Sequence, residues 1–306
     1  MELKGYFIRE SGLLFIKGKE RRDFFHRIST NDFSKSSESN FVPTVLTTDK
    51  GRIIDLVCYF EFKDYALLQT TKENEDIVID FLKKYIVSDD VEISKSFKNY
   101  VKIIIYGAEG IKAFLSNYIF EKELPVPGFI DDEEAVIYHD PQFDSRLIIL
   151  APENKLEHYT SLLSDKTLID RESYDIFSME NLIMENKNEL NEDINPIECG
   201  LKRFISYNKG CYIGQEVIAR LDSQNKIPKT MTRFDSKYEI LQNDRVYVKV
   251  NESDTECGFV STSLKSKSGF CGYAFIRSNF LESQNNYFVK RENENISLIT
   301  SLLKIK

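Results

Sequence analysis

The sequence predicts a mixed α+β protein that ends in a small strand-rich domain, a β-barrel or a sandwich. Between residues 13 and 163, short segments typical of strands alternate with segments typical of helices, and hairpin signals separate them. Past Pro228 the pattern changes to short strands separated by polar turns. A length of 306 residues favours two or three domains, at roughly 150 residues per domain. We therefore expect one domain at 1–226 and a second at 227–306.

The individual elements follow from apolar periodicity and from turn residues. The helix expected at 20–28, for example, carries Phe24, Phe25 and Ile28 on one face, and the turn Asp49-Lys-Gly51 separates two strands. In the first part we expect strands at 13–17, 42–47, 53–62, 65–70, 91–94, 101–106, 135–139 and 146–151, and helices at 20–28, 75–85, 110–119 and 154–163. A polar connecting loop is expected at 185–195. Strands of the second part are expected at 231–235, 245–250, 257–262, 270–276 and 296–303.

Composition and charge exclude several classes of function. A formal net charge of −8 would repel a phosphate backbone, so we expect no nucleic-acid partner. No apolar stretch approaches the roughly 20 residues needed to span a bilayer, so we expect no membrane segment. The first residues have charges inside their apolar stretch and no small-residue cleavage site, which favours a cytoplasmic location. Five scattered cysteines without a CxxC pair indicate free thiols.

The segment KGCYIGQE at 209–216 is the strongest candidate for a functional centre. Gly210 and Gly214 permit a tight loop around Cys211. A helix is expected from residue 215 onward, which places Cys211 just before a helix amino terminus and two residues from Lys209. Such an environment lowers the pKa of a thiol and makes the thiolate available for reaction. The alternative is that Cys211 is a small buried residue that fills space beside a turn.

Two carboxylates are further candidates. Asp55 lies inside an otherwise apolar strand, where a buried acid is costly unless it is paired or functional. Its alternative is an edge-strand acid that faces water. Glu198 lies between Pro196 and Gly200, a rigid turn that could direct it into a pocket, and its alternative is a solvated loop acid.

A metal site is not expected from the sequence. Cys199 lies twelve residues before Cys211 and no histidine is near either of them, which is a weak metal signal. The three histidines, His26, His139 and His158, are far apart along the chain. We therefore expect neither a dedicated metal site nor a paired cysteine and histidine.

Four blocks, taken in order, resemble the YgfZ-type folate-binding relatives of the glycine-cleavage T-protein. They are residues 16–18 together with 24–32 (FFHRISTND), 47–55 (TTDKGRIID), 195–201 (NPIECGL) and 209–220 (KGCYIGQEVIAR). The last block is similar to the signature of the YgfZ-type proteins almost letter for letter. The four blocks and the strand-rich tail cover most of the chain.

This resemblance implies two ferredoxin-like α+β portions and a carboxy-terminal β-barrel, with tetrahydrofolate in a central channel. It also implies a role in assembling or repairing iron-sulfur proteins, with iron-sulfur enzymes or cluster-assembly proteins as partners. Cys211 would be the functional thiol, Lys209 and the loop amides would hold the thiolate, and Glu216 would anchor the loop. The residues expected to bind folate are Asp55, Glu198, Tyr212, Gln215, Glu216 and Arg220.

The alternative function is a folate-dependent aminomethyltransferase, as in the T-protein itself. Asp55 would correspond to the strand acid of that family and would belong to the catalytic set with Cys211 and Lys209. However, where T-proteins carry Arg-x-Glu-x-Gly this chain has DIFSM at 175–179, so Phe177 and Met179 replace the acid and the glycine. T-proteins also lack the cysteine motif. The resemblance therefore favours the YgfZ-like role and defines no single reaction.

Overall fold

The structure is a computed structural model of the whole chain. It describes residues 4–34, 36–38, 40–118, 128–132, 134–224, 226–281, 286–291 and 294–302. Two predicted element ends, at residues 119 and 303, lie outside this described part. Within it, no helix is both long enough and apolar enough to cross a membrane.

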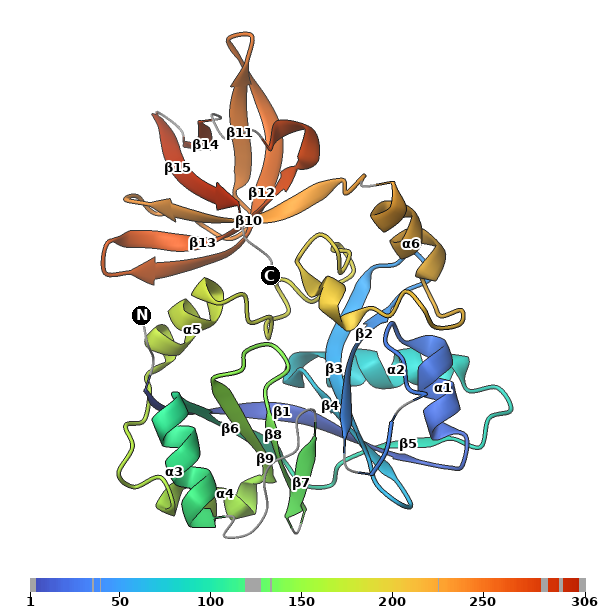
Figure 1. Cartoon of the computed structure of the whole chain (residues 1–306). Coiled ribbons are helices and arrows are strands. Elements are labelled where there is room, and N and C mark those ends of the chain that lie inside the picture. Colours follow the sequence, from blue (N-terminus) through green and yellow to red (C-terminus); the bar gives the residue numbers. More distant parts are fainter. Residues whose placement is uncertain are drawn as a thin grey trace.

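Strand β1 (Gly5–Lys17) joins two curled antiparallel sheets (Figure 1). Its second half pairs with β4 and β5, which gives a sheet of order β2-β3-β4-β1-β5. Its first half pairs with β6, which gives a sheet of order β1-β6-β9-β8-β7. The bounds are β2 Phe41–Thr47, β3 Ile53–Glu61, β4 Ala66–Thr70, β5 Glu92–Lys95, β6 Tyr100–Tyr106, β7 Phe129–Asp132, β8 Ala135–His139 and β9 Arg146–Pro152.

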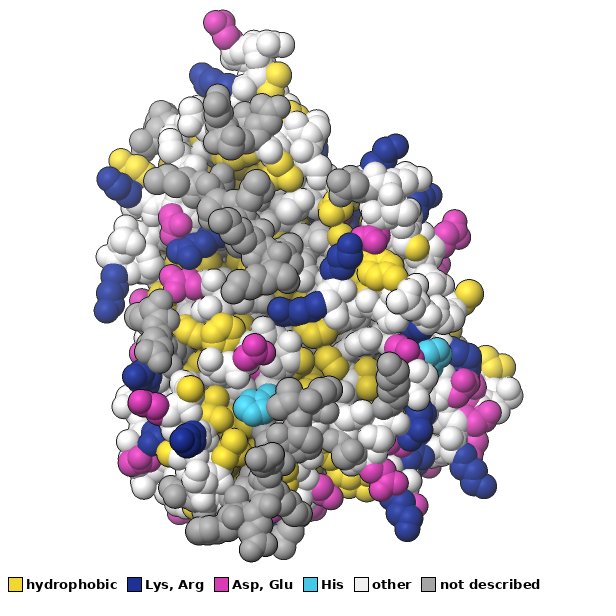
Figure 2. Space-filling model, in the orientation of Figure 1, with side chains coloured by type: hydrophobic (Ala, Val, Ile, Leu, Met, Phe, Trp, Pro, Cys, Tyr) yellow, Lys and Arg dark blue, Asp and Glu magenta, His cyan; other side chains and the backbone are white. Residues whose placement is uncertain are grey.

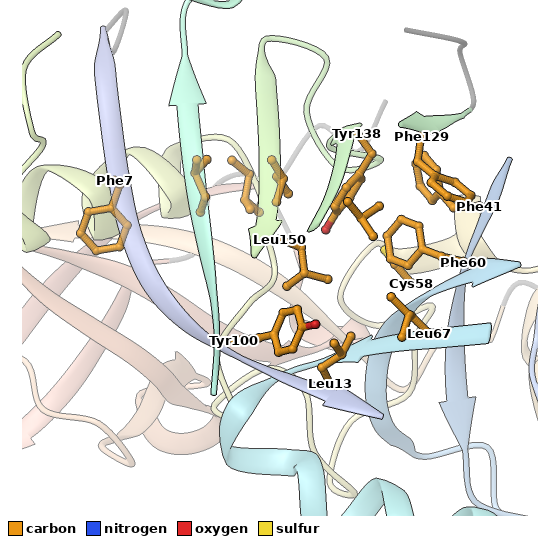
Figure 3. Close-up of a cluster of buried hydrophobic side chains, with 14 of the residues drawn as sticks. Phe7, Leu13, Phe41, Cys58, Phe60, Leu67, Tyr100, Phe129, Tyr138 and Leu150 are labelled. Carbon is orange, nitrogen blue, oxygen red and sulfur yellow. The ribbon is translucent and has the colours of Figure 1, made fainter. Parts of the chain in front are cut away.

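Helices cover the outer faces of the two sheets, and the inner faces share one hydrophobic cluster. Helices α1 (Arg21–Ile28) and α2 (Glu75–Tyr85) pack on the first sheet, and α3 (Ala108–Tyr118) and α4 (Leu156–Ser161) on the second. The inner cluster combines Phe60 and Leu67 of the first sheet with Tyr138 and Leu150 of the second (Figure 3). Because both faces are covered, β3, β6 and β9 are buried along their whole length.

The carboxy-terminal strands close into a barrel of order β10-β13-β12-β11-β14-β15. The bounds are β10 Lys229–Ser236, β11 Arg245–Val250, β12 Ser253–Ser266, β13 Gly269–Arg277, β14 Tyr287–Arg291 and β15 Glu294–Leu302. The barrel packs on the rest of the chain through a cluster that includes Met179, Leu201, Met231 and Phe275. Helix α5 (Arg171–Glu180) lies between the sheets and the barrel (Figure 1).

Several expected elements differ in the structure. The single helix expected at 154–163 is a 3-10 turn, Glu153–Lys155, followed by the short α4, because Pro152 ends the preceding strand and sets the entry to the turn. Strands β7 and β14 and helix α5 were not expected. Cys257 lies inside β12 and Cys271 inside β13, and both are buried.

Candidate functional site

The motif loop is fixed against the 47–55 block by Gly214. This residue has a φ of +81° and immediately precedes α6 (Gln215–Ser223). A Cβ at this position would lie 2.6 Å from the carbonyl oxygen of Thr48, so only glycine satisfies both the backbone angle and the space. The Thr47 hydroxyl donates a hydrogen bond of 2.7 Å to the carbonyl oxygen of Ile213. The loop therefore sits directly on the turn that follows β2.

Lys209 fixes the same loop to the 24–32 block. Its ammonium group donates to the carbonyl oxygens of His26, Ser29 at 2.7 Å and Asn31 at 2.8 Å. Burial disfavours the charged form and lowers the pKa of Lys209 to about 8. Because an ammonium has three N–H groups and all three have carbonyl partners, Lys209 anchors the loop. The sequence had led us to expect that Lys209 holds the Cys211 thiolate, but its three N–H groups are used in these hydrogen bonds.

The 195–201 block holds the turn at Gly51, on which the motif loop and α6 pack. The Asn195 side-chain amide donates to the carbonyl oxygen of Gly51 at 2.7 Å, and its own oxygen accepts from the amide of Ile197 at 2.9 Å. A Cβ on Gly51 would lie 3.2 Å from both Asn195 and Ile218 of α6. Residues 24–32, 47–55, 195–201 and 209–220, far apart along the chain, therefore meet beside α6, at the right of Figure 1.

Cys211 lies on the outside of this loop and is exposed, whereas Cys58, Cys199, Cys257 and Cys271 are buried. A Cβ built on the neighbouring Gly210 would have no described atom within 4 Å, so the surface beside the thiol is open. The alternative in which Cys211 fills space in the interior is therefore wrong.

The remaining motif residues lie around α6. Tyr212 is 7% exposed and packs with Ile218, and the Lys209 ammonium lies 5.1 Å from its ring centre. Gln215 is half-buried, and Glu216 and Arg220 are exposed on the helix. None of these four expected folate ligands lines the outer cavity or the inner recess described below.

Asp55 is completely buried in β3. Its carboxylate accepts hydrogen bonds from the hydroxyl of Thr70, from the amide and the hydroxyl of Thr71, both at 2.8 Å, and from Asn74 at 3.4 Å. Burial raises the pKa of Asp55, and these hydrogen bonds oppose the shift. The alternative of an edge acid facing water is wrong.

Glu198 is also buried, at 1% exposure. It accepts from the Asn195 amide at 2.9 Å and lies 3.5 Å from Arg52 and 3.8 Å from Lys229, the first residue of β10. Burial raises the pKa of Glu198, and the amide and the two cations oppose the shift. Glu198 is thus a paired acid between the sheets and the barrel, and not a solvated loop acid.

A ligand-sized cavity lies between the β8–β9 turn, the end of α5 and the 199–203 segment. This outer cavity has a volume of about 650 Å³, within the usual range for sites of small-molecule ligands. Figure 2 shows hydrophobic side chains gathered between the barrel and the sheets, with Lys and Arg side chains beside them. The lining residues are Pro141, Gln142, Phe143, Asp144, Ser145, Glu180, Asn181, Leu182, Cys199, Gly200, Leu201 and Arg203.

An inner recess of about 30 Å³ adjoins the outer cavity, and Pro141 and Gln142 line both. Thr71 lines the recess and donates to Asp55, so Asp55 lies one residue behind its wall. Phe177 is buried and packs on Phe143 of the outer cavity, with ring centres 5.5 Å apart. Met179 is buried against the barrel.

A cluster of buried charges beside the recess was missed by the sequence analysis. Glu185 lies 3.0 Å from Lys102, 3.2 Å from Arg146 and 3.2 Å from Arg9, and Arg146 lies 2.8 Å from Asp140. The signal was available, because Lys102 and Arg146 stand in the apolar strands YVKIIIY and RLIILAP. A long charged side chain in a fully buried strand indicates a buried partner.

Comparisons with known proteins agree with this architecture. No family model matches the sequence. A chloroplastic protein of Arabidopsis thaliana, named as a putative transferase, is 30% identical over 237 residues, which cover 72% of this chain and 53% of that protein. The chain thus spans about half the length of this relative. An aminomethyltransferase of Caldanaerobacter subterraneus is 24% identical over 95% of this chain and 82% of its own length.

Two further comparisons concern a YgfZ protein and a solved T-protein structure. The tRNA-modifying protein YgfZ of Aliivibrio fischeri is 25% identical over 78% of this chain and 73% of that protein. The structure of the glycine cleavage aminomethyltransferase T from Bartonella henselae superposes with a TM-score of 0.83 at 12% identity, covering 99% of this chain and 86% of that chain. The fold is therefore that of a glycine-cleavage T-protein. In sequence, the chain is similar both to a YgfZ protein and to aminomethyltransferases.

Proposed function

We propose that this chain is a tetrahydrofolate-binding accessory protein for the assembly or repair of iron-sulfur proteins. The observation that carries the proposal is the exposed thiol of Cys211 on a loop that three other sequence blocks fix in place. A thiol held on a rigid, open loop is available to a protein partner, and thiolates are the usual ligands of iron-sulfur clusters.

The outer cavity is the proposed folate site. Its volume of about 650 Å³ suits a ligand of that size. Phe143 supplies an aromatic wall, and Arg203, which donates to the carbonyl oxygen of Gln142 at 3.2 Å, supplies a cation for a carboxylate. Partial burial lowers the pKa of Arg203, and the nearby Asp140 and Asp144 oppose the shift.

The thiol and the cavity are two separate places in this proposal. Cys211 and Asp55 line neither the outer cavity nor the recess, within the part of the chain that the structure describes. We therefore propose that Cys211 acts on iron-sulfur enzymes or cluster-assembly proteins at the surface. Folate would then be a cofactor bound in the outer cavity, and it would not react with the Cys211 thiol.

Complementation tests the role of Cys211. A strain that lacks its own YgfZ-type protein is supplied with the wild type, with Cys211→Ala, or with Asn208→Ala as a matched control in the same exposed loop. We expect the wild type and Asn208→Ala to restore the activity of iron-sulfur enzymes and Cys211→Ala to fail. Equal rescue by all three would remove Cys211 from the mechanism.

Calorimetry tests the folate site. We expect tetrahydrofolate to bind the wild type, and Arg203→Gln to weaken binding at least tenfold, because the variant loses the cation that lines the cavity. Lys202→Gln is the matched control, since Lys202 is exposed, adjacent and outside the lining. Absence of binding to the wild type would reject the folate proposal.

Aminomethyl transfer to folate is the second candidate. The buried Asp55 favours it, since it lies one residue behind the recess, and so do the aminomethyltransferases among the relatives. Phe177 opposes it, because an aromatic ring fills the position of the T-protein acid. Incubation with aminomethylated carrier protein and tetrahydrofolate should yield methylenetetrahydrofolate with the wild type and none with Asp55→Asn. No product from the wild type would reject this candidate.

The domain organisation is part of the same proposal. We propose that residues 1–226 form two ferredoxin-like portions, one on each side of the shared strand β1, and that residues 227–306 form a separate barrel domain. The order of the two sheets around β1 supports the first statement. The start of the closed barrel at Lys229 supports the second. Limited proteolysis should cut first near residues 224–228 if the boundary lies there.

A further inference from the structure

The inner recess is too small for folate but has an unusual lining. Its volume of about 30 Å³ leaves room for only one or two water-sized groups. It lies where the two sheets face each other, and Figure 3 shows Cys58 of β3 and Tyr138 of β8 in the hydrophobic cluster beside it. The lining residues are Leu56, Cys58, Gln69, Thr71, Lys102, Tyr138, Asp140, Pro141, Gln142, Ile148, Met184 and Glu185.

The charges beside the recess form a set of ion pairs. The four buried members are two cations, Lys102 and Arg146, and two carboxylates, Asp140 and Glu185, and none is more than 8% exposed. Arg9, which is less buried, lies 3.2 Å from Glu185 and has Glu73 as a further acidic neighbour. Three cations therefore share the Glu185 carboxylate, and Lys102 has no described carboxylate of its own.

Both oxygens of Glu185 have hydrogen-bond partners, and the Asp140 carboxylate has one hydrogen bond and one ion pair. Oε1 of Glu185 faces Lys102 and Arg146, and Oε2 faces Arg9 and Tyr174. The Asp140 carboxylate accepts from the amide of Gln142 at 2.7 Å and lies 2.8 Å from Arg146. The recess therefore has little capacity to accept further hydrogen bonds from a ligand through these acids.

Lys102, in contrast, has N–H groups that make no hydrogen bond to the described residues. Among the described residues its ammonium group makes one hydrogen bond, of 3.0 Å, to Glu185, and an ammonium carries three N–H groups. Lys102 also lines the recess directly. Leu56, Ile148 and Met184 supply apolar parts of the same lining. A site of this kind fits a group with a charged oxygen end and a C–H end.

We propose that the inner recess binds a small monocarboxylate of the size of formate, held by the ammonium group of Lys102. The carboxylate accepts from the N–H groups of Lys102 that have no partner among the described residues, and its C–H side faces the apolar part of the lining. The recess and the outer cavity share Pro141 and Gln142, so the same carboxylate chemistry can come from a free acid or from the end of a larger ligand. The proposal holds whether or not the outer cavity binds folate.

Titration of the full chain with [13C]formate tests the proposal. At constant ionic strength we expect saturable broadening of the formate NMR signal, and Lys102→Met should weaken binding at least tenfold. Lys98→Met is the matched control, because Lys98 pairs with Glu134 at the surface and should leave binding unchanged. Wild-type affinity in Lys102→Met, or equal displacement of formate by chloride and by acetate, would overturn the assignment of a carboxylate site.

A second variant and a competition experiment with tetrahydrofolate complete the test. Cys58→Leu fills the recess without changing a charge and should also abolish formate binding, so the test stands even if Lys102→Met fails to fold. A repeat with saturating tetrahydrofolate separates the two sources of the carboxylate. Competition would assign the recess to the end of the larger ligand, and simultaneous binding to a free acid. Formate binding without any folate binding would reject the folate proposal alone.

Discussion

Replacing Glu189 by glutamine should stabilise the protein at alkaline pH. Glu189 lies in the segment between α5 and the 195–201 block and is 2% exposed. Its carboxylate accepts hydrogen bonds from Ser261 at 3.0 Å and from Thr262, both on β12 of the barrel. Burial raises the pKa of Glu189 to about 7, and the two hydroxyl groups oppose the shift.

The sign and size of the effect follow from proton linkage. The folded chain keeps this proton up to about pH 7, whereas the unfolded chain releases it near the ordinary value of 4.5. The free energy of unfolding of the wild type therefore falls between these two pH values, and the loss is complete above pH 7. At about 1.4 kcal/mol per pKa unit, the loss amounts to about 3 kcal/mol. Glutamine keeps an oxygen for the two hydroxyl groups and carries no charge.

The assay is urea unfolding followed by circular dichroism at pH 4.5, 6 and 8. We expect Glu189→Gln to match the wild type at pH 4.5 and to exceed its free energy of unfolding by up to about 3 kcal/mol at pH 8. Glu192→Gln, an exposed change in the same segment, should show no such difference. If Glu189→Gln is no more stable than the wild type at pH 8, or differs equally at all pH values, the reasoning is wrong.

Three further predictions concern the motif loop. Gly214→Ala should lower the free energy of unfolding by about 2 kcal/mol or more, because its Cβ would meet a carbonyl oxygen at 2.6 Å with φ at +81°. Gly210→Ala, with open space, should have little effect in the same urea assay, and equal losses would contradict the argument. Lys209→Met removes three hydrogen bonds and should speed proteolysis of the loop, so an unchanged cleavage rate would contradict its anchoring role. Cys211→Ser should change the free energy of unfolding by no more than about 0.5 kcal/mol. It should also remove the exposed thiol that a labelling reagent reaches in the folded chain, whereas Cys257→Ser should keep that labelling because Cys257 is buried.

The strands with a continuous apolar sequence were predictable, because such runs with flanking turns have few alternatives. Strand β6 (Tyr100–Tyr106) and helix α2 (Glu75–Tyr85) match their expected ranges to within one residue. The start of α6 at Gln215 also follows from the sequence. In these segments the local pattern and the tertiary environment favour the same structure.

Other features depend on contacts that one sequence does not contain. The first half of β1 was missed because Arg9 and Glu10 interrupt its alternation, and Arg9 is satisfied by Glu185, 176 residues away. Helix α5 was missed although its signal was present, since Asp170 caps it by accepting from the amide of Ser173. The charged cluster at the recess joins several strands and a loop, so its composition follows only from the folded arrangement.

The structure separates what the motif does for folding from what is left for function. Gly214, Lys209 and Asn195 each have a packing or hydrogen-bonding reason for their identity, and those reasons are complete without any ligand. Cys211 has no such reason, because its side chain is exposed and the loop is held by its neighbours. A change at Lys209 or Gly214 would therefore reduce any activity through the fold of the loop. A change at Cys211 leaves the loop intact, so the outcome of the complementation experiment with Cys211→Ala depends on the chemistry of the thiol itself.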